Sequence, residues 1–202
     1  MSVTETTEDA PRTRVATRNR ELTRERLLES ARVLFADRGL HGVTTHDIAR
    51  DAGVAAGTFY LHFENKEAVF RQIAGSCVAQ LREQLGRALQ NADTPEEAVR
   101  AHAEALVVFA EGNRELIRIL FSGDADAASV ESEVLDELAE TIARARSASG
   151  RVPHDCDAEV LGHALVGMYA RVVAWWAEDP SRKDREAVIQ TLTRIQLAGT
   201  QP

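Results

Sequence analysis

Apolar residues along the chain recur every three or four positions, which is the period of an α-helix, and strand-like alternation is hard to find. The pattern therefore predicts an all-α protein of about nine helices. The first helix is expected from near Thr23 to Arg38, and a long fourth helix from Asn65 to about Leu89. Later helices are expected at about 94–111, 114–121, 130–147, 157–177 and from 184 onward. Residues 1–19 carry no apolar period and predict a flexible arm.

Helix start signals support two of these boundaries. Thr94 is followed by Pro95 and Glu97, which together make a cap, a first-turn proline and a capping-box acid. Ser181 and Asp184 have the same spacing and are expected to cap the final helix.

The segment from Thr44 to Phe63 predicts two short helices joined by a tight turn. Thr44 and Asp47 form a capping-box pattern at the start of the first of them. Gly53 suits the positive φ of a sharp helix exit, and Ala55 opens a second helix with small residues that let its backbone lie close against a groove. This is the layout of a helix-turn-helix whose second helix reads DNA.

The segment from about Arg20 to Phe70 resembles the DNA-binding domain of the TetR family of bacterial transcriptional regulators. The resemblance is carried by RERLLESARVLFADRG, TTHDIARDAGV and GTFYLHFENKEAVF, in that order. It implies an N-terminal three-helix helix-turn-helix DNA-binding domain over 20–65. It also implies a C-terminal helical domain over 66–202 that binds an effector and forms the dimer.

The resemblance also implies which residues face DNA. They are Thr44, Thr45, Ala55, Ala56, Gly57, Thr58, Tyr60, His62 and Lys66. The two threonines and Lys66 are expected at phosphates, and the small residues in the major groove. Many relatives carry a basic or polar residue where this chain has Ala56, which leaves apolar contact with a thymine methyl as its possible role.

The charge distribution agrees with a domain that docks on phosphate. The chain has a net charge of −8, yet residues 11–50 contain nine arginines and only five acids. Residues 63–202 contain 15 basic and 23 acidic residues. Two interpretations stay open for the arginines of the predicted arm, contact with a minor groove or phosphates and a solvated tail; these are Arg12, Arg14, Arg18 and Arg20.

The C-terminal part is expected, by the same resemblance, to hold a pocket for a small effector. The candidate lining residues are His102, Leu106, Phe109, Phe121, Leu138, Met168 and Trp175. Each of them is equally well explained as plain core. Their apolar and aromatic character predicts a hydrophobic or amphipathic ligand.

The helix expected over 157–177 is apolar nearly all round and carries no formal charge between Glu159 and Arg171. A helix that is apolar on two sides has two surfaces to bury, here on its own core and on a twin subunit. The predicted dimer face consists of Gly162, Val166, Tyr169 and Val173 with Val188, Leu192 and Ile195 of the final helix. A membrane span is the competing interpretation, and Arg171 and His163 argue against it.

No catalytic constellation or phosphate-binding fingerprint is present, so neither an enzyme nor a cofactor is predicted. His154, Cys156 and His163 could suggest a metal site, but they are expected on different faces, and no metal is predicted. Cys77 and Cys156 are expected to be reduced and buried, as in a cytoplasmic protein, and no secretory signal is visible.

These features predict a homodimeric repressor that leaves a near-palindromic DNA operator when a small hydrophobic or amphipathic effector binds. Its partners would be double-stranded DNA, a second copy and the effector, with no membrane. The helix from 66 to 89 is expected to carry the signal. The alternative is a helical small-molecule-binding protein without a regulatory role on DNA.

Overall fold

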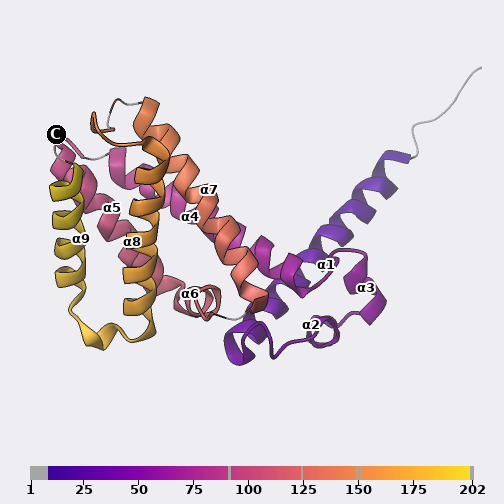
Figure 1. The fold of residues 1–202 in the computed structure, drawn as a ribbon. Helices are drawn as coiled ribbons and strands as arrows, with labels where there is room; N and C mark the ends of the chain where they lie inside the picture. The colour runs from indigo at the N-terminus through magenta and orange to yellow at the C-terminus, as the bar shows by residue number, and fades with distance from the viewer. Residues whose placement is uncertain (1–8, 91, 124, 149, 151, 201–202) are drawn as a thin grey trace, which may run out of the picture. The chain divides into compact units, whose positions relative to one another are not determined.

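The computed structural model describes residues 9–90, 92–123, 125–148, 150 and 152–200, and within them every regular element is a helix (Figure 1). This confirms the all-α prediction. The chain divides into two compact units, residues 1–70 and residues 71–202. The sequence had placed this boundary between residues 65 and 66.

The first unit contains α1 (Asp9–Arg38), α2 (Thr45–Asp51), α3 (Ala56–Tyr60) and the start of α4 (Lys66–Gln90). Its core is built from large side chains that are almost fully buried, and these are Leu27, Phe35, Leu40, Ile48, Phe59 and Phe70. The rings of Phe35 and Phe70 meet edge to face, with centroids 5.9 Å apart. The apolar stripe of α1 thus packs against the helix-turn-helix and the first turn of α4.

The helix α1 begins at Asp9, well before the predicted start near Thr23. The backbone of residues 9–19 is therefore helical, where the sequence predicted a flexible arm, and residues 1–8 lie outside the described part. Extending an existing helix is far less costly than starting one, and a proline is tolerated in the first turn, where Pro11 lies. The side chains of 15–22 are exposed, so no apolar period could reveal this extension.

The second unit continues α4 and adds five α-helices and one short 3-10 helix. These are α5 (Pro95–Gly112), α6 (Arg114–Leu120), α7 (Ala125–Ala148), α8 (Ala158–Glu178), η1 (Pro180–Arg182) and α9 (Arg185–Thr200). The predicted start of α5 is confirmed, because Thr94 and Glu97 form a complete capping box with Pro95 in the first turn. The helix α7 packs along α8, and α5 packs against α9.

The corner between α8 and α9 differs in detail from the prediction. Asp184 caps α9 through Oδ2, which accepts from the backbone N–H of Glu186 at 3.1 Å. Ser181 does not cap α9, because it lies in η1 and donates to Asp179 Oδ1 from both its backbone N–H (3.0 Å) and its hydroxyl (2.6 Å). The predicted cap of the final helix is therefore provided by Asp184 alone, and Ser181 belongs to the 3-10 turn before it.

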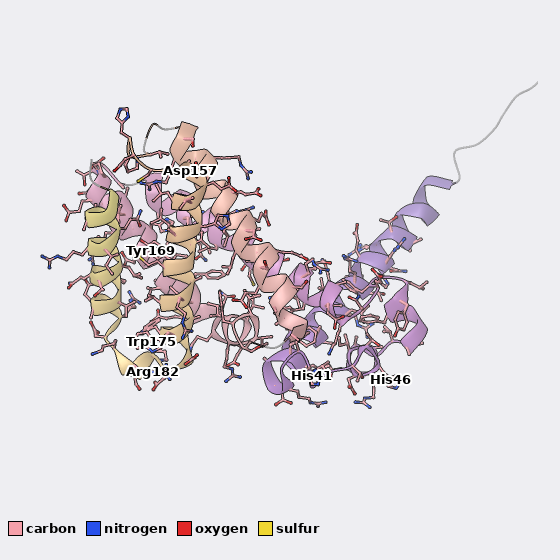
Figure 2. The ribbon with its side chains drawn as sticks, viewed as in Figure 1. His41, His46, Asp157, Tyr169, Trp175 and Arg182 are labelled. Atoms are coloured by element: carbon pink, nitrogen blue, oxygen red, sulfur yellow. The ribbon has the colours of Figure 1, made fainter. Side chains whose placement is uncertain are left out.

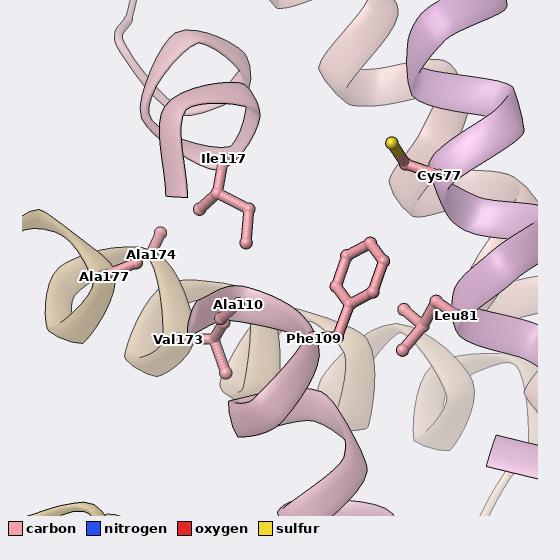
Figure 3. Close-up of a cluster of buried hydrophobic side chains, with 8 residues drawn as sticks. All are labelled: Cys77, Leu81, Phe109, Ala110, Ile117, Val173, Ala174 and Ala177. Carbon is pink, nitrogen blue, oxygen red and sulfur yellow. The ribbon is translucent and has the colours of Figure 1, made fainter. Parts of the chain in front are cut away.

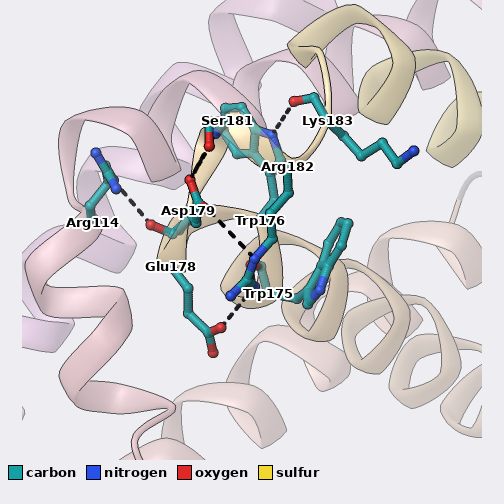
Figure 4. Close-up of polar contacts among 9 residues, drawn as sticks. Arg114, Trp175, Trp176, Glu178, Asp179, Ser181, Arg182 and Lys183 are labelled. Carbon is teal, nitrogen blue, oxygen red and sulfur yellow. Dashed lines mark hydrogen bonds and ion pairs between the residues drawn. The ribbon is translucent and has the colours of Figure 1, made fainter.

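Side-chain hydrogen bonds and an ion pair stabilise the corner between α8 and α9 (Figure 4). Trp176 Nε1 donates to the carbonyl of Lys183 at 3.0 Å, and Arg114 Nε of α6 donates to the carbonyl of Ala177 at 3.0 Å. Arg182 Nη1 bridges Glu178 at 2.9 Å and the carbonyl of Trp175 at 3.0 Å. Arg114 and Arg182 thus satisfy acceptors in the last turn of α8, and Trp176 holds the residue that follows η1 against α8.

Two buried clusters form the core of the second unit, and α8 belongs to both. The first joins α4, α5, α6 and α8, and Phe109 in it points toward Leu81 and Cys77 of α4 (Figure 3). The second joins α5, α8 and α9 around Trp176. The helix α8 is the one described helix long and apolar enough to cross a membrane. Because α8 contributes to both clusters, it is a core helix with two buried sides.

The predicted dimer face is wrong for six of its seven residues, which are buried within this single chain. They are Gly162, Val166, Tyr169, Val173, Val188 and Leu192. A Cβ on Gly162 would lie 2.5 Å from the carbonyl oxygen of Ala139, so α7 covers this side of α8 at close range. Only Ile195, 51% exposed, remains at the surface. Both apolar sides of α8 are covered by helices of the same chain, which periodicity alone does not reveal.

Candidate functional site

The helix-turn-helix begins with the predicted capping box at α2. Thr44 Oγ1 accepts from the backbone N–H of Asp47, and Asp47 Oδ2 accepts from the backbone N–H of Thr44, both at 3.1 Å. The Thr44 hydroxyl also lies 2.6 Å from Asp47 Oδ2, and these hydrogen bonds, more than the nearby Arg50, lower the pKa of Asp47. The Thr44 hydroxyl therefore serves the cap in this structure.

The turn between α2 and α3 depends on Gly53, whose φ is +67°. A Cβ at this position would lie 2.9 Å from Nη2 of Arg26. The same guanidinium donates to the carbonyl of Ala52. An L-residue with a side chain would therefore be strained here and would also displace Arg26 from the end of α2.

The short helix α3 presents one small, exposed surface and one buried anchor. Phe59 is fully buried and packs against the rings of Tyr60 and Phe63. The predicted groove residues are exposed at Ala55, Ala56 and Gly57 and half-buried at Thr58. Tyr60 is 61% exposed, and its hydroxyl lies 3.0 Å from Thr45 Oγ1. Two hydroxyls that the sequence assigned to DNA, from different helices, thus meet at one place.

The other two predicted DNA residues are less free. Lys66 Nζ donates to the carbonyl of Leu40 at 2.9 Å, near the end of α1. The pKa of His62 is lowered, chiefly by partial burial and then by Arg20 and Arg24, so the imidazole is neutral at neutral pH. Neither side chain is simply an exposed cation.

Sequence reasoning missed the role of three arginines in α1. Arg20 Nη2 donates to the carbonyl of Leu61 at 3.3 Å, and Arg24 Nη1 donates to the carbonyl of His62 at 2.9 Å. The guanidinium of Arg24 also lies 4.4 Å from the centre of the Phe63 ring. Together with Arg26, they tie the carbonyl ends of α2 and α3 to α1. The i, i+4 spacing of Arg20 and Arg24 was the available signal that they share one helix face. The predicted contacts of Arg12 and Arg14 lie outside the described side chains.

The second unit encloses an apolar cavity of about 120 Å³ between α4, α5, α6, α7 and α8. Five of the seven predicted lining residues do line it, namely His102, Leu106, Phe109, Phe121 and Leu138. Residues of α4 contribute a whole wall that the prediction did not include, and these are Ala74, Cys77, Val78, Leu81 and Leu85. Cys77, Leu81 and Leu85 follow one another at intervals of four residues, the spacing of one helix face.

Met168 and Trp175 do not line the cavity, contrary to the prediction. Both pack against the cluster formed by α5, α8 and α9. The guanidinium of Arg182 lies 5.9 Å from the Trp175 ring, at the lower end of α8 (Figure 2). The cavity is instead reached from α8 by Tyr169 and Val173. Because successive helical residues are about 100° apart, a shift of one position moves a side chain off the cavity wall.

Few polar side chains reach the cavity. Tyr169 donates its hydroxyl hydrogen to Gln196 Oε1, and burial raises the pKa of Tyr169. Cys77 Sγ lies 3.7 Å from Asn113 Oδ1. Burial, with a smaller effect from Arg146, lowers the pKa of His102 to about 4. The lining is therefore uncharged at neutral pH.

Ion pairs join α4 to α7 beside this cavity. Arg71 Nε lies 2.6 Å from Glu133 Oε2, and Arg82 Nη2 lies 2.9 Å from Glu137 Oε1. The same stretch of α7 supplies Leu138 to the cavity. The cavity wall and the attachment of α4 thus come from one helix.

The possible metal site is not assembled. His154 and Cys156 are exposed in the loop before α8, and His163 is exposed on α8. Within the described residues, no three potential metal ligands lie together. The expectation that both cysteines are buried holds for Cys77 and is wrong for Cys156, which is exposed because its loop has no covering element.

Comparison with known proteins gives matches over both units. A family model described as bacterial regulatory proteins, tetR family, matches residues 27–73. The transcriptional regulator YdgC of Bacillus subtilis (strain 168) is 29% identical over 139 residues, covering 66% of this chain and 70% of YdgC. The transcriptional repressor KstR2 of Rhodococcus jostii (strain RHA1) is 36% identical over 80 residues, which cover 38% of this chain and 39% of KstR2.

Among solved structures, the FadR repressor of Thermus thermophilus in complex with lauroyl-CoA is 27% identical. It superposes with a TM-score of 0.67 over 89% of this chain and 95% of its own. The sequence match lies in the helix-turn-helix, and the structural match extends through the helical domain as well. The protein is a DNA-binding transcriptional regulator controlled by a small-molecule effector. Residues 27–73 thus match the TetR family of bacterial transcriptional regulators, and most of the chain is similar to a repressor of that family.

Proposed function

We propose that the protein is a homodimeric repressor that leaves its operator when an amphipathic molecule with a long acyl chain enters the cavity. The apolar, uncharged cavity beside α4 is the observation that carries this proposal. Two copies related by a two-fold axis would place their α3 helices in successive major grooves, about 34–36 Å apart, on a near-palindromic site. The regulator would act in the cytoplasm.

The proposed DNA contacts follow the exposed side of the helix-turn-helix. The small residues at the start of α3 would let the helix backbone approach base edges. The Thr45–Tyr60 hydroxyl pair would donate to phosphate oxygens. Lys66, tied to the end of α1, would add positive charge, and neutral His62 would act as a hydrogen-bonding group. Thr44 would act chiefly by holding the first turn of α2.

The acyl class of the effector is supported by the walls of the cavity and by one relative. Hydrocarbon gains free energy from burial against apolar side chains, at about 25 cal/mol per Å². The lining offers leucine, isoleucine, valine and phenylalanine side chains from five helices. The Thermus FadR protein, similar along most of both chains, binds lauroyl-CoA.

Control of DNA binding would run through α4. This helix starts at Lys66, inside the DNA-binding unit, and lines the cavity from Ala74 to Leu85. An effector changes operator affinity only if it binds one position of α4 better than another. A coupling free energy of about 1–3 kcal/mol would change that affinity by about 5- to 150-fold.

The dimer contact is proposed on the outward sides of α8 and α9. Val160 is 67% exposed and Ile195 is 51% exposed. Both apolar side chains are exposed to solvent in the single chain, so a second copy could bury them. They replace the six buried residues that the sequence had suggested.

The experiment that tests this function is fluorescence anisotropy with DNA from the region upstream of the gene, over a salt series. The wild type should bind selectively, and Tyr60→Ala should weaken binding about 10-fold by removing a phosphate contact. Tyr60→Phe should show an intermediate loss, and the exposed Val108→Ala in α5 should bind like the wild type. Lauroyl-CoA should then release the wild type from DNA.

Two results would count against the proposal. Equal binding of operator and unrelated DNA would remove the role of a specific repressor. Selective DNA binding that neither lauroyl-CoA nor shorter or longer acyl-CoAs can weaken would leave the regulator but remove the acyl class of effector.

A further inference from the structure

His102 is the one cavity-lining polar side chain of the described residues whose hydrogen-bonding groups are not committed. It lies on α5, is half-buried, and lines the cavity. Its ring packs against Tyr169, with centroids 5.1 Å apart and planes tilted by 60°. No hydrogen bond joins either imidazole nitrogen to another described residue.

The other polar groups on the wall have partners inside the protein. The Tyr169 hydroxyl hydrogen is given to Gln196 of α9, behind the cavity wall. The Cys77 thiol is turned to Asn113. Apart from these two groups, whose hydrogens are already donated, the polar side chain that a ligand meets on the described wall is His102.

The electrostatic surroundings of His102 determine which hydrogen bonds its imidazole can make. Burial and the positive charge of Arg146 on α7 keep the imidazole neutral, with its pKa lowered to about 4. A neutral imidazole has one N–H donor and one bare nitrogen acceptor. The same positive charge of Arg146 favours a ligand atom that carries negative or partial negative charge. An oxygen acceptor on the ligand satisfies both conditions.

We propose that His102 is a specificity-determining residue that donates a hydrogen bond to the acyl oxygen of the effector, while the hydrocarbon chain fills the space between α4 and α7. The inference rests on the proposed function and deepens it. A purely apolar molecule would leave the imidazole buried without a partner, which is unfavourable. An acyl compound supplies the missing acceptor and the hydrocarbon together.

The test uses a matched pair of ligands in isothermal titration calorimetry with the full-length protein. Lauroyl-CoA has the acyl oxygen, whereas S-dodecyl-CoA, a thioether, has the same chain and nucleotide but no carbonyl. The wild type should bind lauroyl-CoA about 10-fold more tightly, as expected for one buried hydrogen bond. Lauric acid, as a third ligand, distinguishes recognition of a free carboxylate from recognition of a thioester.

Three variants separate the hydrogen bond from simple packing. His102→Leu should remove the preference for lauroyl-CoA and leave S-dodecyl-CoA binding nearly unchanged. His102→Gln keeps a donor and should restore part of the preference. Leu106→Ala, one helical turn away on the same wall, should weaken both ligands equally, because it removes only apolar contact.

Several results would overturn the inference. A preference that survives in His102→Leu, or a wild type that binds both CoA ligands equally well, would exclude the hydrogen bond from His102 and leave the acyl class of effector intact. A wild type that binds none of the three ligands would instead refute the acyl class itself, and the role of His102 toward it. Circular dichroism of each variant checks that His102→Leu is folded, and His102→Gln gives an independent reading.

Discussion

Single side chains in this protein often serve the fold and the site together. Arg20, Arg24 and Arg26 contribute to the positive charge of the DNA-binding unit, and each also donates to a carbonyl at the end of α2 or α3. An arginine can do both because its planar guanidinium carries five N–H groups. Replacing one of them by lysine would keep the positive charge but remove the planar group whose several N–H donors allow both roles.

His102 makes a specific prediction about stability and pH. Its pKa is about 4 in the folded protein and near the ordinary 6.5 in the unfolded chain. The unfolded state therefore takes up this proton first as the pH falls. The stabilisation from neutral His102 is complete above about pH 6.5 and is lost toward pH 4, by up to about 3 kcal/mol.

Urea unfolding of the wild type and His102→Gln at about pH 7 and pH 5 measures this effect. The wild type should lose about 2 kcal/mol more than the variant between these two pH values. Acidic residues and the remaining histidines titrate in both proteins, so the difference isolates His102. An equal loss in both would mean that the surroundings of His102 do not lower its pKa in the folded protein.

At the scale of the elements, close helix approach decides how α8 is buried. Gly162 lets the backbone of α7 come so near that a Cβ would lie 2.5 Å from the carbonyl oxygen of Ala139. At the other glycines within described helices, an added Cβ would have no backbone atom of a neighbouring helix within 4 Å. The close approach of the two backbones at this point therefore requires a glycine, and α7 in turn carries one wall of the cavity.

A pair of glycine substitutions tests this contact. Gly162→Ala should destabilise the protein by about 1–3 kcal/mol, because α7 must move. Gly75→Ala in α4 is the matched control, since it meets no atom within 4 Å and should stabilise its helix by about 0.5–1 kcal/mol. Thermal unfolding of both variants gives the comparison. A stable Gly162→Ala protein would contradict the observed approach of α7 to α8.

Helix α4 shows how one element can serve two processes. Its first turn belongs to the DNA-binding unit, and its middle lines the cavity and pairs with acids of α7. These surface ion pairs each contribute little to stability, about 0–1 kcal/mol. They nevertheless join α4 to α7, so the proposed ligand between the two helices would act on the same contacts.

At the scale of the whole molecule, the dimer proposed above leads to a prediction, because it uses the exposed apolar side chains of α8 and α9. Val160→Glu combined with Ile195→Glu should convert a dimer into a monomer of 22.2 kDa, because burying two carboxylates at a contact is unfavourable. Light scattering after gel filtration measures the mass. Operator affinity should fall as well, since one half-site contact is lost.

Val108→Glu is the control for this experiment, because Val108 is similarly exposed, at 43%, but lies on α5. It should leave the dimer intact. Dissociation caused by Val108→Glu, with no effect of the α8 and α9 substitutions, would move the dimer contact to α5.

The sequence by itself determined the helical class, the order of the helices, the helix-turn-helix and the resemblance to the TetR family. Caps such as Thr44 with Asp47, and turns such as Gly53, act over a few residues, so their chemistry can be read locally. The exposed residues of α3 were predictable for the same reason. About two-thirds of the predicted cavity residues also followed, because an apolar stripe at helical spacing marks an inward face.

Only the tertiary structure decided which inward face meets which neighbour. Tyr169 and Val173 reach the cavity while Met168 and Trp175 pack elsewhere, although all four are apolar or aromatic residues of α8. The contacts of the α1 arginines were missed, and the six buried residues of the predicted dimer face were misassigned, for the same reason. Hydrophobic periodicity indicates which side chains are buried. Which helix buries them depends on packing among helices that are distant in sequence.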